Sequence, residues 1–177
     1  MSEAFYSELI EHLSNTLEFE DAIEITLEAN PGTTEMKRFV GFRAAGINRL
    51  SIGVQSFNDH HLKKLGRIHS AADAIRAIKQ AKLAGFDNMN IDLMHGLEAQ
   101  TSEQAVSDLG QAIELNPSHV SWYQLTIEQN TEYFRRPPTL PEDDTLWRIQ
   151  QEGARFLDRH GFQQYEVSAY ASEGREA

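Results

Sequence analysis

The chain has 177 residues, of which 40% are hydrophobic and 24% charged, and its formal net charge is −11 at pH 7. This length and composition suit a folded domain with a sizeable core and exclude a largely disordered chain. The negative charge argues against charge-driven binding to nucleic acid or to an anionic membrane surface. No apolar run approaches the ~20 residues of a membrane span, and the first residues lack a signal-peptide pattern. We therefore expect a cytoplasmic protein.

The sequence contains no cysteine. It therefore offers no disulfide, no thiol nucleophile and no thiolate ligand for an iron–sulfur cluster. Seven histidines are present, but none has the spacing of a zinc site. We expect the adjacent His60 and His61 to lie on a solvated helix face.

Helical and extended segments alternate along the chain. Phe5, Leu9, Leu13 and Leu17 recur at every fourth position, which predicts an amphipathic opening helix. Five apolar runs between helical segments predict strands, and the alternation predicts a parallel α/β sheet in a single domain over residues 1–177. These strands are expected near residues 23–28, 50–55, 88–94, 119–127 and 164–170.

Polar residues predict where several helices begin. Thr33 or Thr34 precedes a short apolar helix, and Ser70 precedes a longer one. The segment Thr101–Gln104 has the form of a capping box, in which the first and fourth side chains satisfy each other's backbone N–H groups.

Side chains alternate between the two faces of a strand. One face of the first four strands is apolar, and in the fourth strand this alternation assigns Tyr123 to the apolar face. Helices should cover the apolar face, so the polar face should line the lumen of a curved sheet. The carboxyl ends of such strands form the mouth where α/β barrels bind ligands. We expect four strand-end residues to gather there: Glu28, Gln55, Asp92 and Thr126.

Five strands are too few to close a barrel, which typically takes about eight. The chain also opens on a helix with no strand before it. We expect a partial barrel, truncated at both ends. Its uncovered sheet edges would favour self-association.

Five segments carry a family signature in order and spacing. They are residues 27–33 (LEANPGT), 49–57 (RLSIGVQSF), 65–69 (LGRIH), 90–97 (NIDLMHGL) and 121–128 (SWYQLTIE). Together they closely resemble the oxygen-independent coproporphyrinogen III oxidase-like radical SAM proteins, and among them the heme chaperone branch. The resemblance extends from about residue 21 to residue 170.

The resemblance implies the central part of a partial (βα)6 radical SAM barrel. It implies that Glu28 contacts a ribose or amino acid group of S-adenosylmethionine (SAM), that Gln55, Arg67 and Asp92 line the cavity on the SAM side, and that Thr126 contacts SAM more weakly. In the intact family a 4Fe-4S cluster reduces SAM to a 5′-deoxyadenosyl radical, but the CxxxCxxC loop that holds this cluster is absent here. Porphyrin or heme is the implied partner. The resemblance assigns this chain no catalytic residue and no metal ligand.

Two other functions remain open from the residues. Glu28, Asp92 and Glu128 at strand ends could hold Mg²⁺ in a carboxylate-lined barrel enzyme. Alternatively, the chain is a non-catalytic module that binds porphyrin or a partner chain, with Arg135 and Arg136 meeting porphyrin propionates. Purely structural interpretations also exist, in which Glu28 caps the next helix or pairs with Arg49, and Asp92 belongs to a hydrogen-bond network across the lumen.

Overall fold

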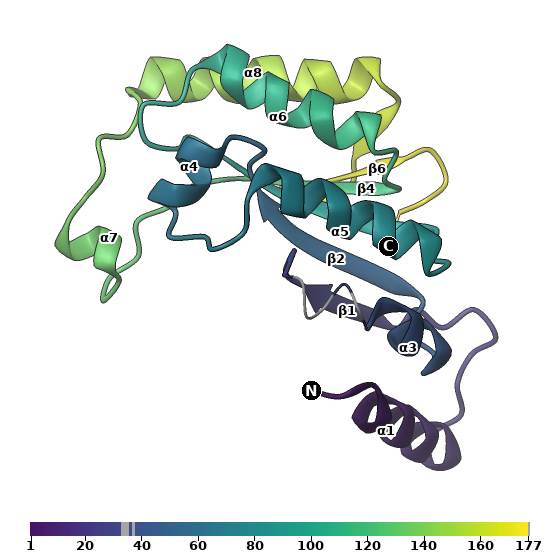
Figure 1. Ribbon diagram of the computed structural model, residues 1–177. Coiled ribbons are helices and arrows are strands. Elements are labelled where there is room, and N and C mark those ends of the chain that lie inside the picture. Colours follow the sequence, from purple (N-terminus) through teal and green to yellow (C-terminus); the bar gives the residue numbers. More distant parts are fainter. Residues whose placement is uncertain (33–35, 37, 177) are drawn as a thin grey trace.

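The computed structural model describes residues 1–32, 36 and 38–176 (Figure 1). Its helices are α1 (Glu3–Thr16), α3 (Phe39–Ala44), α4 (Asp59–Lys64), α5 (Ala71–Leu83), α6 (Ser102–Glu114), α7 (Glu132–Arg135) and α8 (Asp143–Arg159). Its strands are β1 (Thr26–Ala29), β2 (Arg49–Gln55), β3 (Asn88–His95), β4 (His119–Gln124), β5 (Phe162–Gln164) and β6 (Ala169–Ser172).

The strands form one curved sheet with the order β1-β2-β3-β4-β6-β5. Neighbours among the first four strands are parallel, and helices connect them. This arrangement confirms the predicted α/β class and an open, mostly parallel barrel-like sheet. The carboxyl ends of β1 to β4 meet at one edge, and α4 and α7 lie on that side, at the left of Figure 1.

The last predicted strand, near residues 164–170, is wrong. The chain instead forms an antiparallel hairpin of β5 and β6, and β6 also pairs antiparallel with β4. The turn between them is closed by the N–H of Tyr165, which donates to the carbonyl of Ala169 at 3.1 Å. Val167 lies in this turn and is 88% exposed, so the alternation expected around it does not exist.

Two of the predicted helix caps are confirmed. Ser70 and Asp73 form a capping box at the start of α5, and Thr101 and Gln104 form one at the start of α6. Each box satisfies two backbone N–H groups that the first helical turn leaves without a partner. The predicted caps Thr33 and Thr34 lie outside the described residues.

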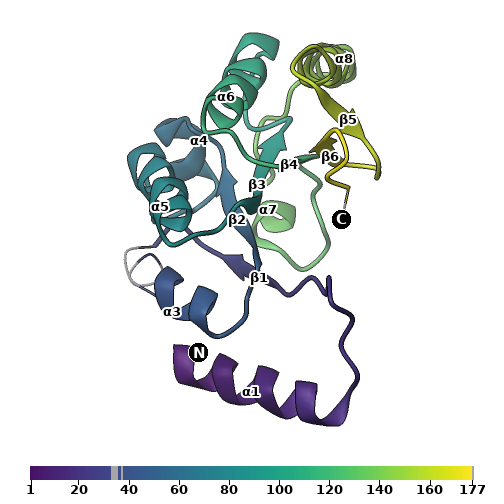
Figure 2. The ribbon, with the colours of Figure 1, turned by 90° about the vertical axis from the view of Figure 1, so that its right-hand side faces the viewer.

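The core lies between the sheet and a layer of helices. Figure 2 shows α3, α5, α6 and α8 along one face of the sheet. The strand residues that face them are fully buried, among them Ile52, Val54, Ile91 and Leu93. Burial of such side chains contributes roughly 1.5–3 kcal/mol each to the free energy of unfolding. The opposite face of β1 to β4 carries the polar side chains, as the alternation predicts for β1, β2 and β3.

In the part of the chain that the structure describes, no helix combines the length and the apolar character needed to span a membrane.

Candidate functional site

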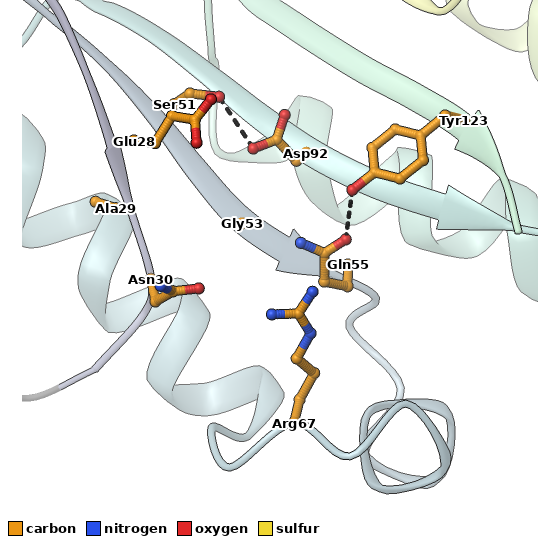
Figure 3. Close-up of a pocket in the computed structure, with 9 residues that line it drawn as sticks. All are labelled: Glu28, Ala29, Asn30, Ser51, Gly53, Gln55, Arg67, Asp92 and Tyr123. Carbon is orange, nitrogen blue, oxygen red and sulfur yellow. Dashed lines mark hydrogen bonds between the residues drawn. The ribbon is translucent and has the colours of Figure 1, made fainter. Parts of the chain in front are cut away.

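A cavity of about 430 Å³ opens at the carboxyl ends of β1, β2 and β3 (Figure 3). Its size falls within the range of small-molecule sites. The residues that line it are Glu28, Ala29, Asn30, Ser51, Gly53, Gln55, Arg67, Asp92 and Tyr123. The structure therefore brings together four of the five predicted site residues, from four separate segments of the chain.

Asp92 lies at the centre of a polar network on the face of the sheet opposite the helices. Its carboxylate accepts a hydrogen bond from Ser51 Oγ at 3.0 Å and one from Asn90 Nδ2 at 2.7 Å. Asn90 also donates to Ser121 Oγ at 2.9 Å, so the network crosses β2, β3 and β4. Burial raises the pKa of Asp92, the hydrogen bonds oppose this shift, and the nearby charge of Glu28 adds to it. The structural reading of Asp92 is thus correct, and the same carboxylate lines the cavity.

Glu28 is the third residue of β1 and points into the cavity beside Ser51 (Figure 3). Its register partner on β2 is Ser51, which in turn bonds to Asp92 on β3. Glu28 and Asp92 therefore lie on either side of β2. The alternative pairing of Glu28 with Arg49 is not found among the described residues, in which Arg49 Nη1 lies 3.6 Å from Glu24 Oε1. Two carboxylates therefore face the same cavity, which suits a ligand with positive charge or hydroxyl donors.

Gln55 ends β2 in the left-handed backbone region, with φ of 72°. The pairing of β2 with β3 shifts between Gly53 and Gln55, and the Gln55 side chain lines the cavity together with Ser51 and Gly53 of the same strand. Gln55 is almost fully buried, and Tyr123 Oη donates to its Oε1 at 2.7 Å.

Arg67 follows the turn that ends α4. Gly66 takes φ of 70°, and the N–H of Arg67 donates to the carbonyl of Leu62 at 2.9 Å, as in a Schellman-type helix end. The guanidinium extends from this turn toward Gln55 and the cavity (Figure 3). Within the described residues Arg67 forms no ion pair, so its charge faces the cavity without a carboxylate partner.

Thr126 does not line the cavity, and the alternation predicted for the fourth strand is wrong. β4 ends at Gln124, so Thr126 lies beyond the strand and is exposed. Tyr123 occupies the polar face, while Trp122 is buried against α8, where a Cβ at Gly153 would overlap its ring. Tyr123 is thus a cavity residue that was not predicted, because the adjacent aromatic residues Trp122 and Tyr123 both suit an apolar face.

Asp108 of α6 holds the loop after Gln55 by two hydrogen bonds, from the side of the sheet that the helices cover. Its carboxylate accepts a hydrogen bond from Ser56 Oγ at 2.6 Å and one from the N–H of Phe57 at 2.8 Å. Burial raises the pKa of Asp108 to about 6, against the opposing effect of these hydrogen bonds. Sequence reasoning missed this residue, which lies in the middle of an amphipathic helix.

No histidine lines the cavity. His61 is buried and its pKa is lowered, chiefly by burial, so the expected solvated face holds only for His60. Among residues 1–32, 36 and 38–176, no group of three or more His, Cys, Asp or Glu side chains is arranged to hold a metal ion. Glu128, the third carboxylate of the Mg²⁺ hypothesis, does not line the cavity.

Known proteins with similar sequences belong to the radical SAM superfamily. A family model described as the radical SAM superfamily matches residues 3–109. The heme chaperone HemW of Haemophilus influenzae is 57% identical over 166 residues, which cover 94% of this chain and 43% of the relative. HemW of Escherichia coli is 59% identical over 151 residues, which cover 85% of this chain and 40% of the relative. The chain thus spans about two fifths of the length of these curated relatives.

A solved structure shares the fold. The coproporphyrinogen III oxidase HemN from Escherichia coli, described as a radical SAM enzyme, superposes with a TM-score of 0.87 at 30% identity. The match covers 99% of this chain and 41% of that protein. The resemblance inferred from the sequence is confirmed: this chain belongs to the radical SAM superfamily and is related to the heme chaperone HemW and to HemN.

Proposed function

We propose that the cavity binds SAM and that Glu28, Gln55, Arg67 and Asp92 are its contact residues in this chain. The observation that carries the proposal is their convergence on one cavity of about 430 Å³ from four segments. Membership of the radical SAM superfamily supports the choice of ligand. Thr126 is left out of the proposal because β4 ends before it.

The chemistry of these side chains fits SAM. Arg67 offers a cation to the carboxylate of the methionine part, and such charge-assisted hydrogen bonds are the stronger ones. Glu28 and Asp92 offer acceptors to the ammonium group or to ribose hydroxyls. Gln55 offers an amide to the nucleoside. In this superfamily bound SAM is the source of radical chemistry; these residues would bind and orient it.

The chain does not fit the second cofactor of the superfamily. A 4Fe-4S cluster is held by thiolates, and none of the 177 residues is a cysteine. We therefore assign no cluster ligand and derive no redox step for these residues.

We further propose heme or a related porphyrin as the partner, on the strength of the names of the relatives. Arg135 and Arg136 lie at the end of α7 beside the exposed Phe134, and Arg136 lies 3.5 Å from Glu132 at an exposed position. Cations beside an apolar ring suit a porphyrin with propionate groups. A hemin titration followed at the Soret band tests this: Arg135→Ala/Arg136→Ala should weaken binding. The charge-matched Arg155→Ala/Arg159→Ala on α8 should not.

The SAM proposal is tested by mapping where a stable analogue binds. We expect millimolar S-adenosylhomocysteine to shift NMR signals of Glu28, Gln55, Arg67 and Asp92 in ¹⁵N- and ¹³C-labelled protein, and Mg²⁺ to leave them unchanged. Shifts that spread elsewhere on the surface would contradict the proposal. If Mg²⁺ titrates the two carboxylates at sub-millimolar concentration while the nucleoside has no effect, the metal-dependent alternative is correct.

A further inference from the structure

The orientation of the Gln55 carboxamide is set by its neighbours. The two ends of an amide are chemically opposite, since the oxygen accepts hydrogen bonds and the NH₂ group donates them. Tyr123 Oη donates to Gln55 Oε1 at 2.7 Å, so the oxygen end is engaged on the β4 side. The nitrogen end then faces the cavity (Figure 3). Burial raises the pKa of the Tyr123 hydroxyl, which keeps the donor proton in place at neutral pH.

Gly53 makes room for the nitrogen end. A Cβ added to Gly53 would lie 3.0 Å from Gln55 Nε2 and 3.6 Å from Asn30 Oδ1. A contact of 3.0 Å is shorter than ordinary van der Waals packing, so an alanine at this position would push the amide aside. Gly53 therefore has a specific steric role in the cavity, in the same strand and two residues before Gln55.

The main chain of Gln55 is fixed independently of these two contacts. Its φ of 72° is unfavourable for a residue with a side chain. The two residues that follow it are held by Asp108 through Ser56 Oγ and the N–H of Phe57. Because the backbone is held in this way, Tyr123 and Gly53 determine only the orientation of the side-chain amide.

We propose that Tyr123 and Gly53 are positioning residues that hold the Gln55 amide with its NH₂ group toward the cavity, so that the site selects a ligand with a hydrogen-bond acceptor there. For an S-adenosyl compound this acceptor is a ribose oxygen or a ring nitrogen of adenine. The identity of the ligand rests on the proposed function. The orientation of the amide does not, because it is a property of the free chain.

The first test is made without ligand. The side-chain NH₂ signals of Gln55 should show nuclear Overhauser contacts to the Hα protons of Gly53 in the wild-type chain, because Gln55 Nε2 lies 3.0 Å from the place where a Cβ of residue 53 would be. Tyr123→Phe, which removes only the hydroxyl, should shift these signals and bring the two amide protons toward the values of a freely rotating side chain. Unchanged Gln55 signals in Tyr123→Phe would overturn the positioning role. If that variant fails to fold, Gly53→Ala gives the same readout through the steric contact.

The second test is a double-mutant cycle with S-adenosylhomocysteine. Loss of one oriented hydrogen bond corresponds to about a 5- to 10-fold weaker affinity, which we expect for Tyr123→Phe and for Gln55→Ala. In the Gln55→Ala background, Tyr123→Phe should change the affinity by less than about 2-fold, because Tyr123 acts through Gln55. Gln55→Glu keeps an acceptor for Tyr123 but removes the donor, so it should bind as weakly as Gln55→Ala.

Different results would contradict the proposed SAM site and the proposed positioning role of Tyr123 and Gly53. If S-adenosylhomocysteine binds the wild-type chain and Tyr123→Phe with equal affinity, or if the effect persists in Gln55→Ala, the positioning role is wrong and the SAM site stands. If the wild-type chain does not respond to the nucleoside while Gln55 is ordered by Tyr123, the proposed function is wrong and the amide orientation stands.

Discussion

Ser56 Oγ donates a hydrogen bond of 2.6 Å to the carboxylate of Asp108, which joins the loop after β2 to the middle of α6. The same carboxylate accepts the N–H of Phe57 at 2.8 Å. Gln55, the cavity residue in the left-handed backbone region, directly precedes this pair. A helix on the outer layer thereby fixes the backbone of a residue that lines the cavity on the opposite face of the sheet.

Replacing Asp108 should therefore destabilise the protein. Asp108→Ala leaves two buried donors without an acceptor, and we expect a loss of about 2–4 kcal/mol in the free energy of unfolding at pH 7.5. Asp108→Asn keeps one acceptor and should lose about half as much. Urea unfolding followed by circular dichroism measures both, with the exposed Asp158→Ala on α8 as control. Equal stability of Asp108→Ala and Asp158→Ala would show that the anchor has no energetic role.

Two helical glycines should respond in opposite directions to alanine. A Cβ at Gly153 of α8 would overlap the rigid ring of Trp122, and such overpacking costs about 2–3 kcal/mol. A Cβ at Gly110 of α6 would lie 3.7 Å from Phe156, an ordinary contact, so Gly110→Ala should stabilise the protein by about 0.5–1 kcal/mol. Thermal melts of the two variants test this pair. A stable Gly153→Ala would contradict the packing of α8 on β4.

Acid should destabilise the fold through His95. This side chain is 1% exposed and packs on Trp122, and burial lowers its pKa to about 4 while Gln150 opposes the shift. The folded state thus binds the proton less tightly than the unfolded state, whose histidine titrates near 6.5. His95 therefore contributes stability above pH ~6.5, which is lost as the pH falls toward 4, by up to ~3 kcal/mol.

His95→Phe keeps an aromatic ring on Trp122 but does not titrate. The variant should show a flatter decrease of unfolding free energy between pH 6.5 and 4 than the wild-type chain in denaturant melts. Parallel pH profiles for the two proteins would mean that His95 is not the group responsible.

Much of the site could be predicted because parallel topology is restrictive. Where strands and helices alternate, the carboxyl ends of the strands share one edge, so Glu28, Gln55 and Asp92 had to converge. The position of Arg67 at the site was predicted from the family resemblance. Strand register could not predict it, because Arg67 lies in a loop. Its position in the structure depends on the helix end at Gly66.

The face of β4 could not be predicted from alternation. Trp122 and Tyr123 are adjacent aromatic residues, and either suits the apolar face. The contact of Trp122 with Gly153, more distant in sequence, decides which of them faces α8. The bond from Tyr123 to Gln55 joins residues 68 positions apart and likewise leaves no local signal.

The hairpin of β5 and β6 was missed for a local reason. The turn between Gln164 and Ala169 contains no glycine, proline, asparagine or aspartate, and Ser168 alone is a weak signal of a chain reversal. Its tyrosine and valine favour a strand instead. Pairing with β4, rather than local propensity, determines this region.

Self-association through sheet edges stays a prediction. In the sheet of the described residues, β1 pairs only with β2 and forms one edge, while β5 forms the other. Backbone groups at such edges are available to pair with a second chain. We expect dimers or larger species at micromolar concentration in sedimentation velocity runs. A monomer that persists over the whole concentration range would contradict this prediction.

The most direct measurement is the affinity of S-adenosylhomocysteine for three proteins, determined by NMR titration at pH 7.5. Asp92 lines the cavity, whereas Lys82 lies at the far end of α5 and donates to the carbonyl of Asn116. We predict that the wild-type chain and Lys82→Ala bind with the same affinity and that Asp92→Ala binds about 10-fold more weakly or not at all. Equal affinity of all three proteins, or no binding by any of them, would contradict a SAM site at the carboxyl ends of β1, β2 and β3.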